Sequence, residues 1–573
     1  MTEHPLMKFM INLFAPVQFK KPLGVPTLPT ECMYQIFQHL VDQGEALHPF
    51  LLINRYWCRN VIPFLWARPF EQLNPENMYK IMLVYLSSLN DAEKADLRDL
   101  LVQNSYDSEF ITELMQQNNP LFNYPMMLQE LSIKNLEMIV RSWIHRCNME
   151  FGRQIDQIDQ MDVQINSMTS ILCKLFLRNS VNLRCFRVDK FSSHEDIPEL
   201  STLLEISPSL GFIGLSNISK LEINYSTQSI LKNSLDLLKT IPSLCKRIHT
   251  MNIKLPIFES SNPDIIKVII SIIIAQDKLK EFSLEGVENE NDSRDIIQAL
   301  QSHVRSLSSV EIDSVNISTS SLYVLAKCSN LESLAITNCR GLTIQDMSNT
   351  VTTTPSTIDA LWNNIKFVNL KKLYIKNLSK NTLISSLIIR AAGKSTLQEL
   401  TLDVITQDTI NSIIENCPNI THLSLVNYHP SLHDHLLNSL FQTLKNVTHL
   451  TIQIPSKSSS SISVSSSSII SGKSLPSSLT YLKLQCGFKK IQLDGLLSDC
   501  CNAKLKVLII DVVKILYMDM KVITSFIKGQ TGSSVKFLGI GGGIGCGKVT
   551  KELEELKENF GVCVIPWYEI ANW

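Results

Sequence analysis

The sequence lacks an excess of charge of either sign. It holds 53 lysines and arginines and 54 aspartates and glutamates, which gives a formal net charge of −1 over 573 residues. A protein that attracts nucleic acid or an acidic membrane through its overall field needs a strongly basic balance. The composition therefore disfavours nucleic acid and membrane as partners and leaves open only a local basic patch.

Long hydrophobic runs and a disulfide-like cysteine spacing are also missing. The longest apolar run, VIISIIIA at residues 268–275, is far shorter than the ~20 residues that cross a bilayer. The apolar FMINLFAPV near the N-terminus is short and no clear cleavage site follows it, so we expect no secretory signal. The 14 cysteines are scattered along the chain, which indicates reduced thiols in the cytoplasm or the nucleus.

One glycine-rich stretch suggests a catalytic function. GIGGGIGCGKVT at residues 539–550 follows the apolar VKFL and precedes a helical pattern, the order that a phosphate-binding loop needs. The last position of that template requires Ser or Thr to hold Mg²⁺, whereas Val549 stands there and Thr550 comes one residue late. We therefore interpret the stretch as a turn of the last repeat, with a nucleotide-dependent switch as the less favoured alternative.

A histidine cluster suggests a metal site. NYHPSLHDH carries His429, His433, Asp434 and His435, but no second ligand pair at metal spacing follows. Asp434 falls where a repeat would turn into its helix, so we expect it to cap that helix. No Gly-x-Ser-x-Gly, His-Glu-x-x-His or kinase motif set occurs either. We therefore expect a protein without a metal, a cofactor or catalytic residues.

What the sequence does contain is one short pattern, apolar-x-x-apolar-x-apolar, repeated over its last two-thirds at a mean spacing of about 29 residues. Thirteen copies begin at Leu183, Ile218, Ile248, Leu279, Leu307, Leu331, Leu370, Leu397, Ile420, Val447, Leu479, Leu505 and Val535. The last two apolar residues of each copy place two side chains on one face of a short strand. Return segments such as residues 406–417 have helical apolar spacing. Because one such unit cannot bury its apolar face alone, we predict an α/β solenoid of stacked strand–helix units.

Residues 25–70 form a second informative stretch, with the apolar spacing of three short helices. Pro29 suits the first turn of the first helix, with Thr27 or Thr30 near its cap. The second helix holds Leu47, Leu51 and Leu52, and the third runs from about Arg55 to Trp66, where Pro63 should kink it or end it early. So small a module has a marginal core and would gain stability from a partner.

These residues resemble the F-box. That family reads roughly Leu-Pro-x-Glu, Ile-Phe-x-x-Leu, Leu/Asn/Arg-x-x-Trp and Leu-Trp, and here the matching stretches are LPTE, IFQHL, LINRYW and LW, in the same order. The resemblance implies docking on a Skp-type adaptor and, through it, on the cullin of a ubiquitin ligase. The residues that match positions at that interface or supporting it are Leu28, Pro29, Ile36, Phe37, Leu40, Leu52 and Trp57. The first four are expected to form one partly exposed apolar edge.

The repeats resemble leucine-rich repeats of the cysteine-containing type over residues 171–573. Cys339 follows a strand as in that type, and Cys417 precedes another, after which Asn427 stands in the place of the second cysteine. The resemblance implies a horseshoe with parallel strands on the concave face and helices outside. The expected divisions are then an N-terminal tail at 1–24, the F-box at 25–70, a helical connector at 71–170 and the repeats, with a mobile Ser-rich loop at 456–478.

Both resemblances together imply a substrate-recognition subunit of a Skp–cullin–F-box ubiquitin ligase, which is not itself an enzyme and recruits an unknown target protein. The alternative is a non-catalytic interaction scaffold that uses the same parts in another assembly. The target is expected on the concave face, where aromatic and histidine side chains would form a recognition strip. The candidate residues are Tyr374, His422, His449 and Tyr481, whereas Trp567, Tyr568 and Trp573 should cover the open end of the last repeat.

Overall fold

The computed structural model of the chain describes residues 28–71, 75–115, 120–150, 158–189, 196–200, 213–225, 232–256, 263–342, 365–378, 382–392, 396–403, 405–426, 430–454, 475–486, 504–514, 517–529, 535–543 and 547–565, with a few isolated positions between them. The chain divides into two compact units, Met1–Leu279 and Lys280–Trp573. The Ser-rich stretch at 456–471 and the three C-terminal aromatic residues lie outside the described residues.

The first unit opens with helices that precede any strand. In chain order they are α2 (Thr30–Asp42), the 3-10 helix η1 (His48–Leu52), α3 (Arg55–Leu65), α4 (Pro75–Leu86), α5 (Asp91–Gln103), α6 (Ser108–Met115) and the 3-10 helix η2 (Tyr124–Met127). The Asn54 side chain accepts a hydrogen bond from the Trp57 N–H and so caps α3, which continues through Pro63 to Leu65. No side chain caps α2, whose N-cap residue is Pro29.

Strands and helices then alternate in the rest of the first unit. The elements are β1 (Glu130–Ser132), α7 (Ile133–Glu150), α8 (Ile158–Asn179), β2 (Cys185–Asp189), α10 (Ile213–Ser216), β3 (Lys220–Asn224), α11 (Lys232–Leu244), β4 (Thr250–Lys254) and α12 (Pro263–Ile274). Strands β1 to β4 pair in chain order, each parallel to the next. The sheet therefore begins at Glu130, inside the segment expected to be a helical connector.

The second unit repeats strand and helix throughout. Its elements are β5 (Glu281–Glu285), α13 (Glu290–Ala299), the 3-10 helix η3 (Leu300–His303), β6 (Ser309–Asp313), α14 (Thr319–Ala326), β7 (Ser333–Thr337), β8 (Lys372–Lys376), α16 (Thr382–Ala391), β9 (Glu399–Leu402), α17 (Gln407–Asn416), β10 (His422–Leu425), α18 (Pro430–Thr443), β11 (His449–Ile454), β12 (Tyr481–Cys486), β13 (Val507–Lys514), α20 (Tyr517–Gly529), β14 (Phe537–Gly543), α21 (Gly547–Phe560) and β15 (Cys563–Ile565). These strands also pair in parallel and in chain order.

Every one of the thirteen repeated sequence patterns corresponds to a strand, from β2 to β14. Strands β1 and β15 are additional. LQELSI at residues 128–133, which contains β1, fits the same pattern but is not among the thirteen predicted copies. The predicted return helix at 406–417 is confirmed as α17, which the Thr406 side chain caps. The α/β architecture with parallel strands and stacked units is thus as predicted.

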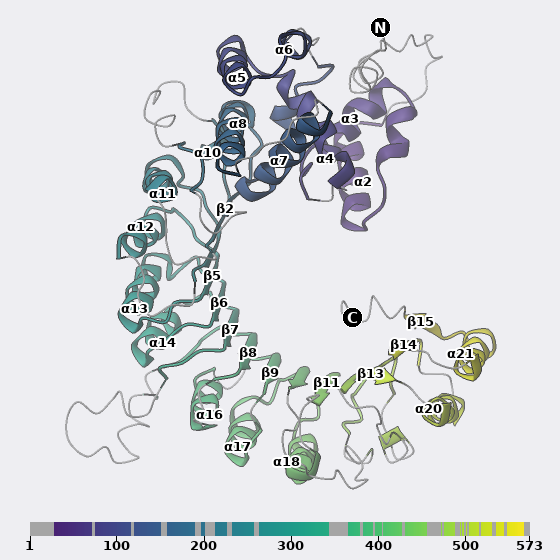
Figure 1. The fold of residues 1–573 in the computed structure, drawn as a ribbon. Coiled ribbons are helices and arrows are strands. Elements are labelled where there is room, and N and C mark those ends of the chain that lie inside the picture. The colour runs from purple at the N-terminus through teal and green to yellow at the C-terminus, as the bar shows by residue number, and fades with distance from the viewer. Residues whose placement is uncertain are drawn as a thin grey trace, which may run out of the picture. The chain divides into compact units, whose positions relative to one another are not determined.

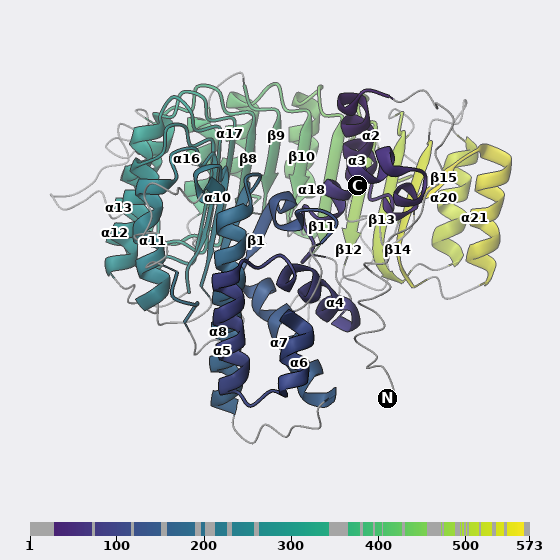
Figure 2. The same cartoon turned by 90° about the horizontal axis from the view of Figure 1, so that it is seen from above.

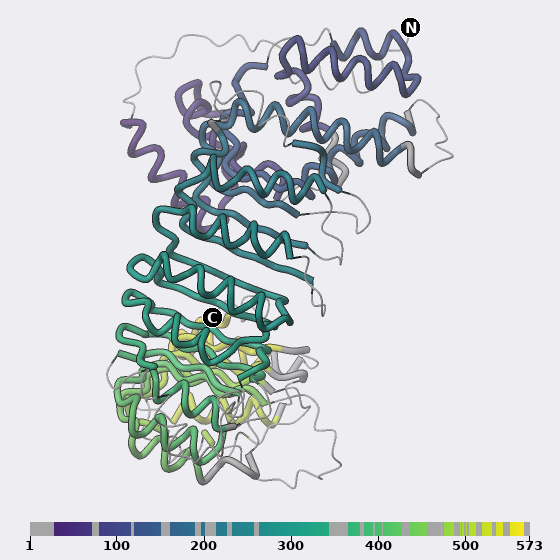
Figure 3. The backbone as a smooth tube through the Cα atoms, turned by 90° about the vertical axis from the view of Figure 1, so that its left-hand side faces the viewer, coloured from purple at the N-terminus to yellow at the C-terminus, as the bar shows by residue number. Residues whose placement is uncertain are grey.

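In the second unit the helices lie on the outer side of the strands, and the strands line the inner side (Figures 1 and 2). Within this unit, successive strand–helix turns stack in chain order (Figure 3). Burial alternates along β7. Leu334 and Ile336 are buried, whereas the alternating residues Ser333, Ala335 and Thr337 are half-buried. We call the sheet face that carries the second set the inner face, because it lies opposite the helices.

A repeated backbone contact joins successive strand–helix repeats just before the strand. Two consecutive N–H groups donate to one carbonyl of the preceding repeat, as Thr421 and His422 do to Gln398 at 2.9 and 3.0 Å. Thr448 and His449 repeat the contact on the Thr421 carbonyl at 2.9 and 3.0 Å. This ladder fixes the register of the strands and hence the rows of side chains on the inner face.

Candidate functional site

The N-terminal module, residues 28–65, has a core of its own. Met33, Phe37, Leu47 and Val61 are buried together. The Phe37 ring contacts three other rings, those of Phe50, Trp57 and Phe64, each at a centroid distance of 5.7 Å. Phe37 is 0% exposed, so the expectation that it belongs to an exposed edge is wrong, because its side chain fills the space between the helices. Of the seven candidate residues for adaptor binding, Phe37 therefore supports the core of the module and does not lie on its surface.

Other candidates of this module point to solvent. Leu28 is 46% exposed, Ile36 is 38% exposed and Leu52 is 88% exposed. Pro29 is exposed as well, and Leu40 and Trp57 are half-buried against the core. Leu28 is held through its backbone, since its carbonyl accepts a hydrogen bond from the Tyr56 hydroxyl. The module therefore presents apolar side chains that its own core does not use.

The segment that follows α3, residues 66–71, fastens the module to the first strands, and we call it the joint. The Trp66 ring lies 4.2 Å from the Tyr124 ring in a tilted arrangement, and the Phe70 ring lies 5.8 Å from the Phe176 ring of α8. The carbonyl of Ala67 accepts two hydrogen bonds, from Gln129 N at 2.8 Å and Glu130 N at 3.3 Å. This is the same pair of hydrogen bonds that joins successive repeats. The Ala67 carbonyl therefore plays for β1 the part that a carbonyl of the preceding repeat plays for the other strands.

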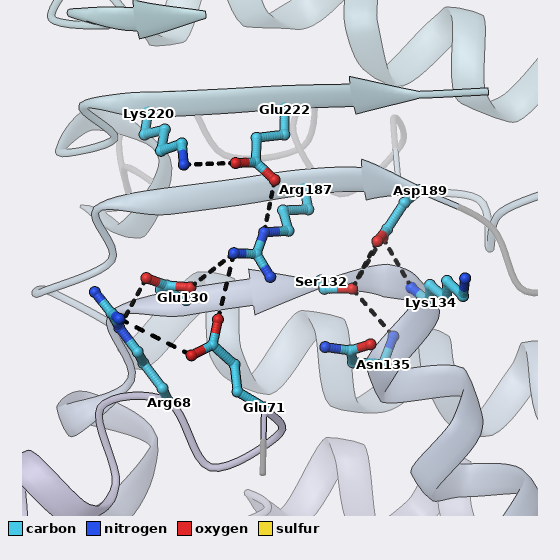
Figure 4. A network of polar contacts seen from close by, with 10 residues as sticks. All are labelled: Arg68, Glu71, Glu130, Ser132, Lys134, Asn135, Arg187, Asp189, Lys220 and Glu222. Atoms are coloured by element: carbon cyan, nitrogen blue, oxygen red, sulfur yellow. Dashed lines mark hydrogen bonds and ion pairs between the residues drawn. The ribbon is translucent and has the colours of Figure 1, made fainter. Parts of the chain in front are cut away.

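The joint also carries charges, and they meet the inner face of β1–β3 (Figure 4). Arg187 of β2 lies between three carboxylates, with Glu222 at 2.7 Å, Glu130 at 3.2 Å and Glu71 at 3.3 Å. Arg68 Nε lies 2.8 Å from Glu130, and Lys220 lies 2.6 Å from Glu222. Burial and the neighbouring Glu71 raise the pKa of Glu130, while Arg68 and Arg187 lower it.

A second contact set, also drawn in Figure 4, ties β2 to the start of α7. The Ser132 hydroxyl donates to the Asp189 carboxylate at 2.9 Å, and the Lys134 N–H donates to it at 3.0 Å. Burial nevertheless raises the pKa of Asp189 above its usual value. Asp189 thus satisfies donors at the N-terminal end of α7, a place that favours a carboxylate.

The sequence pattern predicts neither this contact set nor the joint. Nothing in the repeat marks residues that contact one another across some 57 to 116 positions.

The predicted recognition strip lies on the inner face of the second unit. His422 is opposite His449 in the register of β10 and β11, and His449 is opposite Tyr481 of β12. The two imidazoles stack with their centroids 4.0 Å apart, and the Tyr481 ring stacks on His449 at 5.1 Å. The structure therefore brings together three of the four candidates as one continuous row of rings.

Threonines orient the two imidazoles. Nδ1 of His422 lies 2.9 Å from the Thr421 hydroxyl, and Nδ1 of His449 lies 2.9 Å from the Thr448 hydroxyl. His422 is exposed and His449 is half-buried. Burial and the neighbouring His422 lower the pKa of His449, while Glu399 raises it. His449 is consequently held in its neutral form over a wider pH range than an exposed histidine.

Two of the four strip residues differ from expectation. Tyr374 lies opposite Thr401, two residues further along the strand than the row of rings, so it is not part of the stack. Tyr481 is only 9% exposed, and burial raises its pKa to about 12. It packs in an apolar inner-face cluster with Ile509, Ile565, Val507 and Phe537. The repeat pattern does not predict this cluster, because it marks only the helix-facing residues of a strand, whereas VLII at 507–510 is apolar on both faces.

The glycine-rich stretch begins as a strand. β14 runs from Phe537 to Gly543 and α21 starts at Gly547, with residues 544–546 outside the described part. Gly541 lies opposite Asp511 in the sheet register, and a Cβ placed on Gly541 would lie 2.1 Å from the Asp511 carboxylate oxygen. The absence of a side chain at Gly541 is therefore required by the close approach of Asp511.

The side chains of the histidine cluster at 429–435 lie outside the described part of the structure. The backbone shows that α18 begins at Pro430, so Asp434 is inside the helix and does not cap it. Of the residues that the structure describes, no group of three or more His, Cys, Asp or Glu could hold a metal ion. Within the same residues, no helix is both long enough and apolar enough to span a membrane.

Comparisons with known proteins add no family assignment. No model of a known protein family matches the sequence, and no curated protein matches it significantly.

Proposed function

We propose that the protein is the substrate-recognition subunit of a Skp–cullin–F-box ubiquitin ligase. The observation that carries this proposal is the exposure of Leu28, Ile36 and Leu52 on a module whose core is complete without them. These three residues are also at positions where the sequence resembles the F-box. Docking of a Skp-type adaptor on them would remove their side chains from water, at about 25 cal/mol for each Å² of apolar surface.

The repeats then supply the target-binding part. Their inner face presents the stacked imidazoles of His422 and His449, whose rings give contact area and whose nitrogens can hydrogen-bond. Such a subunit performs no chemistry of its own. It raises the effective concentration of target lysines near the conjugating enzyme that the cullin holds.

The adaptor interface is tested with the double variant Leu28→Ala, Pro29→Ala. The backbone carbonyls of these residues, which accept hydrogen bonds from the Tyr56 hydroxyl and the Met33 N–H, remain in place. We expect capture of a purified Skp-type adaptor to be lost, while circular dichroism and the melting temperature stay unchanged. Val102→Ala on α5 is the matched control, because Val102 is also an exposed apolar residue.

Undiminished adaptor capture by the double variant would contradict the proposal. It would favour the alternative, a scaffold that uses this module in another assembly. Failure of the wild-type protein to bind the adaptor at all would have the same consequence.

A further inference from the structure

We propose that Arg187 is the positioning residue that holds the N-terminal module in one orientation against strands β1–β3. The joint leaves little chain in which the module could turn. Helix α3 ends at Leu65, and the carbonyl of Ala67 already accepts the N–H groups of Gln129 and Glu130. Only Trp66 separates the last helical residue from the backbone ladder of the sheet.

Arg187 and Arg68 both pair with carboxylates across the joint, and Arg187 is the more buried of the two cations. Of the three carboxylates around Arg187, Glu71 belongs to the joint, whereas Glu130 and Glu222 belong to β1 and β3. The side chains of Arg187 and Glu130 are 26% and 14% exposed, whereas that of Arg68 is 57% exposed. Solvent therefore screens Arg68 more strongly than Arg187.

Removal of Arg187 would weaken the attraction across the joint and add a repulsion to it. Glu71 and Glu130 would then face each other with only the exposed Arg68 between them. Two carboxylates held at short range repel each other, and a half-buried one without its partner is costly. The repulsion would push residues 67–71 away from β1 and break the hydrogen bonds to Ala67.

The geometry needs an arginine and not merely a positive charge. The guanidinium donates hydrogen bonds to Glu71 and Glu130 from one terminal nitrogen, while its Nε lies 2.7 Å from Glu222 as an ion pair without hydrogen-bond geometry. A lysine ammonium could contact one or two of these groups but lacks the planar fork. A fixed module matters functionally if the module binds the adaptor, a step that rests on the proposed function, because a rigid connection fixes the direction in which the adaptor leaves the sheet.

The experiment is hydrogen–deuterium exchange of residues 129–130, the donors to Ala67, in the full chain without adaptor. In Arg187→Ala we expect exchange there to be at least about tenfold faster than in the wild type. Exchange of Ser219 and Lys220, which donate to the Arg184 carbonyl two rungs further along the ladder, should change little, as should the melting temperature. Arg184→Ala is the matched control, because Arg184 precedes the same strand, is exposed and carries the same charge.

Arg187→Lys should give an intermediate rate, which a merely space-filling role would not produce. If Arg187→Ala fails to fold, Arg187→Lys is compared with the wild type alone, and faster exchange at 129–130 supports the proposal. Wild-type exchange at 129–130 in whichever variant folds would overturn it. Because the measurement uses no adaptor, its outcome is independent of whether the protein belongs to a ubiquitin ligase.

Discussion

Ile36 and Phe37 are neighbours in α2, yet the side chain of Ile36 faces solvent and that of Phe37 faces the core of the module. Ile36 is 38% exposed, whereas Phe37 is fully buried among the rings of Phe50, Trp57 and Phe64. The pair lies where the core face of the helix meets its free face. Consecutive helical positions are about 100° apart, which is enough to place one side chain in the core and the next in solvent.

This contrast predicts different outcomes for two similar substitutions. Phe37→Ala should destabilise the module by about 3–5 kcal/mol, because it leaves a cavity between the helices. Ile36→Ala should change stability by no more than about 0.5 kcal/mol and weaken adaptor capture. Limited proteolysis of residues 28–65 and adaptor binding distinguish the two effects. Equal protease resistance of both variants would show that Phe37 is not a core residue.

The stacked histidines predict a pH-dependent stability. The folded state lowers the pKa of His449 below the ordinary 6.5, so the unfolded chain binds a proton first as the pH falls. Stability should therefore decrease as the pH drops through 6.5 towards the folded-state pKa, and level off below it. We expect His449→Gln to flatten the change of melting temperature between about pH 7.5 and 5.5. An identical pH profile in wild type and variant would contradict the prediction.

The inner-face row predicts which ring residues recognise a target and which maintain the fold. His422→Ala combined with His449→Ala should weaken target capture from a native cell extract at an unchanged melting temperature. Tyr481→Ala should instead lower the melting temperature, because Tyr481 is buried against Ile509 and Ile565. Mass spectrometry of co-purified proteins checks the first statement and calorimetry the second. Retention of every partner by the double histidine variant would exclude the strip as the target site.

The contact between Asp511 and Gly541 predicts an intolerant glycine. Gly541→Ala should destabilise the second unit by about 1–3 kcal/mol, because the added methyl group meets the Asp511 carboxylate. Gly529→Ala on α20 is the control, since nothing lies within 4 Å of a Cβ placed there. Chemical denaturation of both variants gives the comparison. Equal stability of the two variants would mean that Asp511 can move aside freely.

The glycine-rich stretch also predicts a negative result. Isothermal calorimetry of the wild-type chain with ATP or GTP should show no saturable binding, because Val549 stands where a phosphate-binding loop needs a hydroxyl to hold Mg²⁺. Lys548→Ala should leave the thermograms unchanged. Binding in the micromolar range that is lost in this variant would instead support the alternative interpretation, a nucleotide-dependent switch.

The repeat could be predicted from the amino-acid pattern alone. Paired apolar residues two positions apart can be buried only on one face of a strand, and thirteen copies predicted thirteen strands that the structure contains. The same pattern also predicted which residues share a row, because equal positions in neighbouring parallel units come to lie opposite each other, as His422 and His449 do. Both properties depend on local periodicity, which a single chain displays directly.

Whether a given apolar residue is buried or exposed depends on the other elements that pack against it, which the sequence pattern does not show. Phe37 and Tyr481 were both expected to be available to a partner, and both are buried by residues that come from other elements. The joint was hidden for the same reason, since Arg187 meets Glu71 across 116 positions of sequence. LQELSI at residues 128–133 also fits the pattern and contains β1, but it stands far before the next copy at Leu183, outside the regular spacing. Strand β15 has three residues and is held by its hydrogen bonds to β14. Contacts of this kind depend on how the units stack, which the local pattern does not encode.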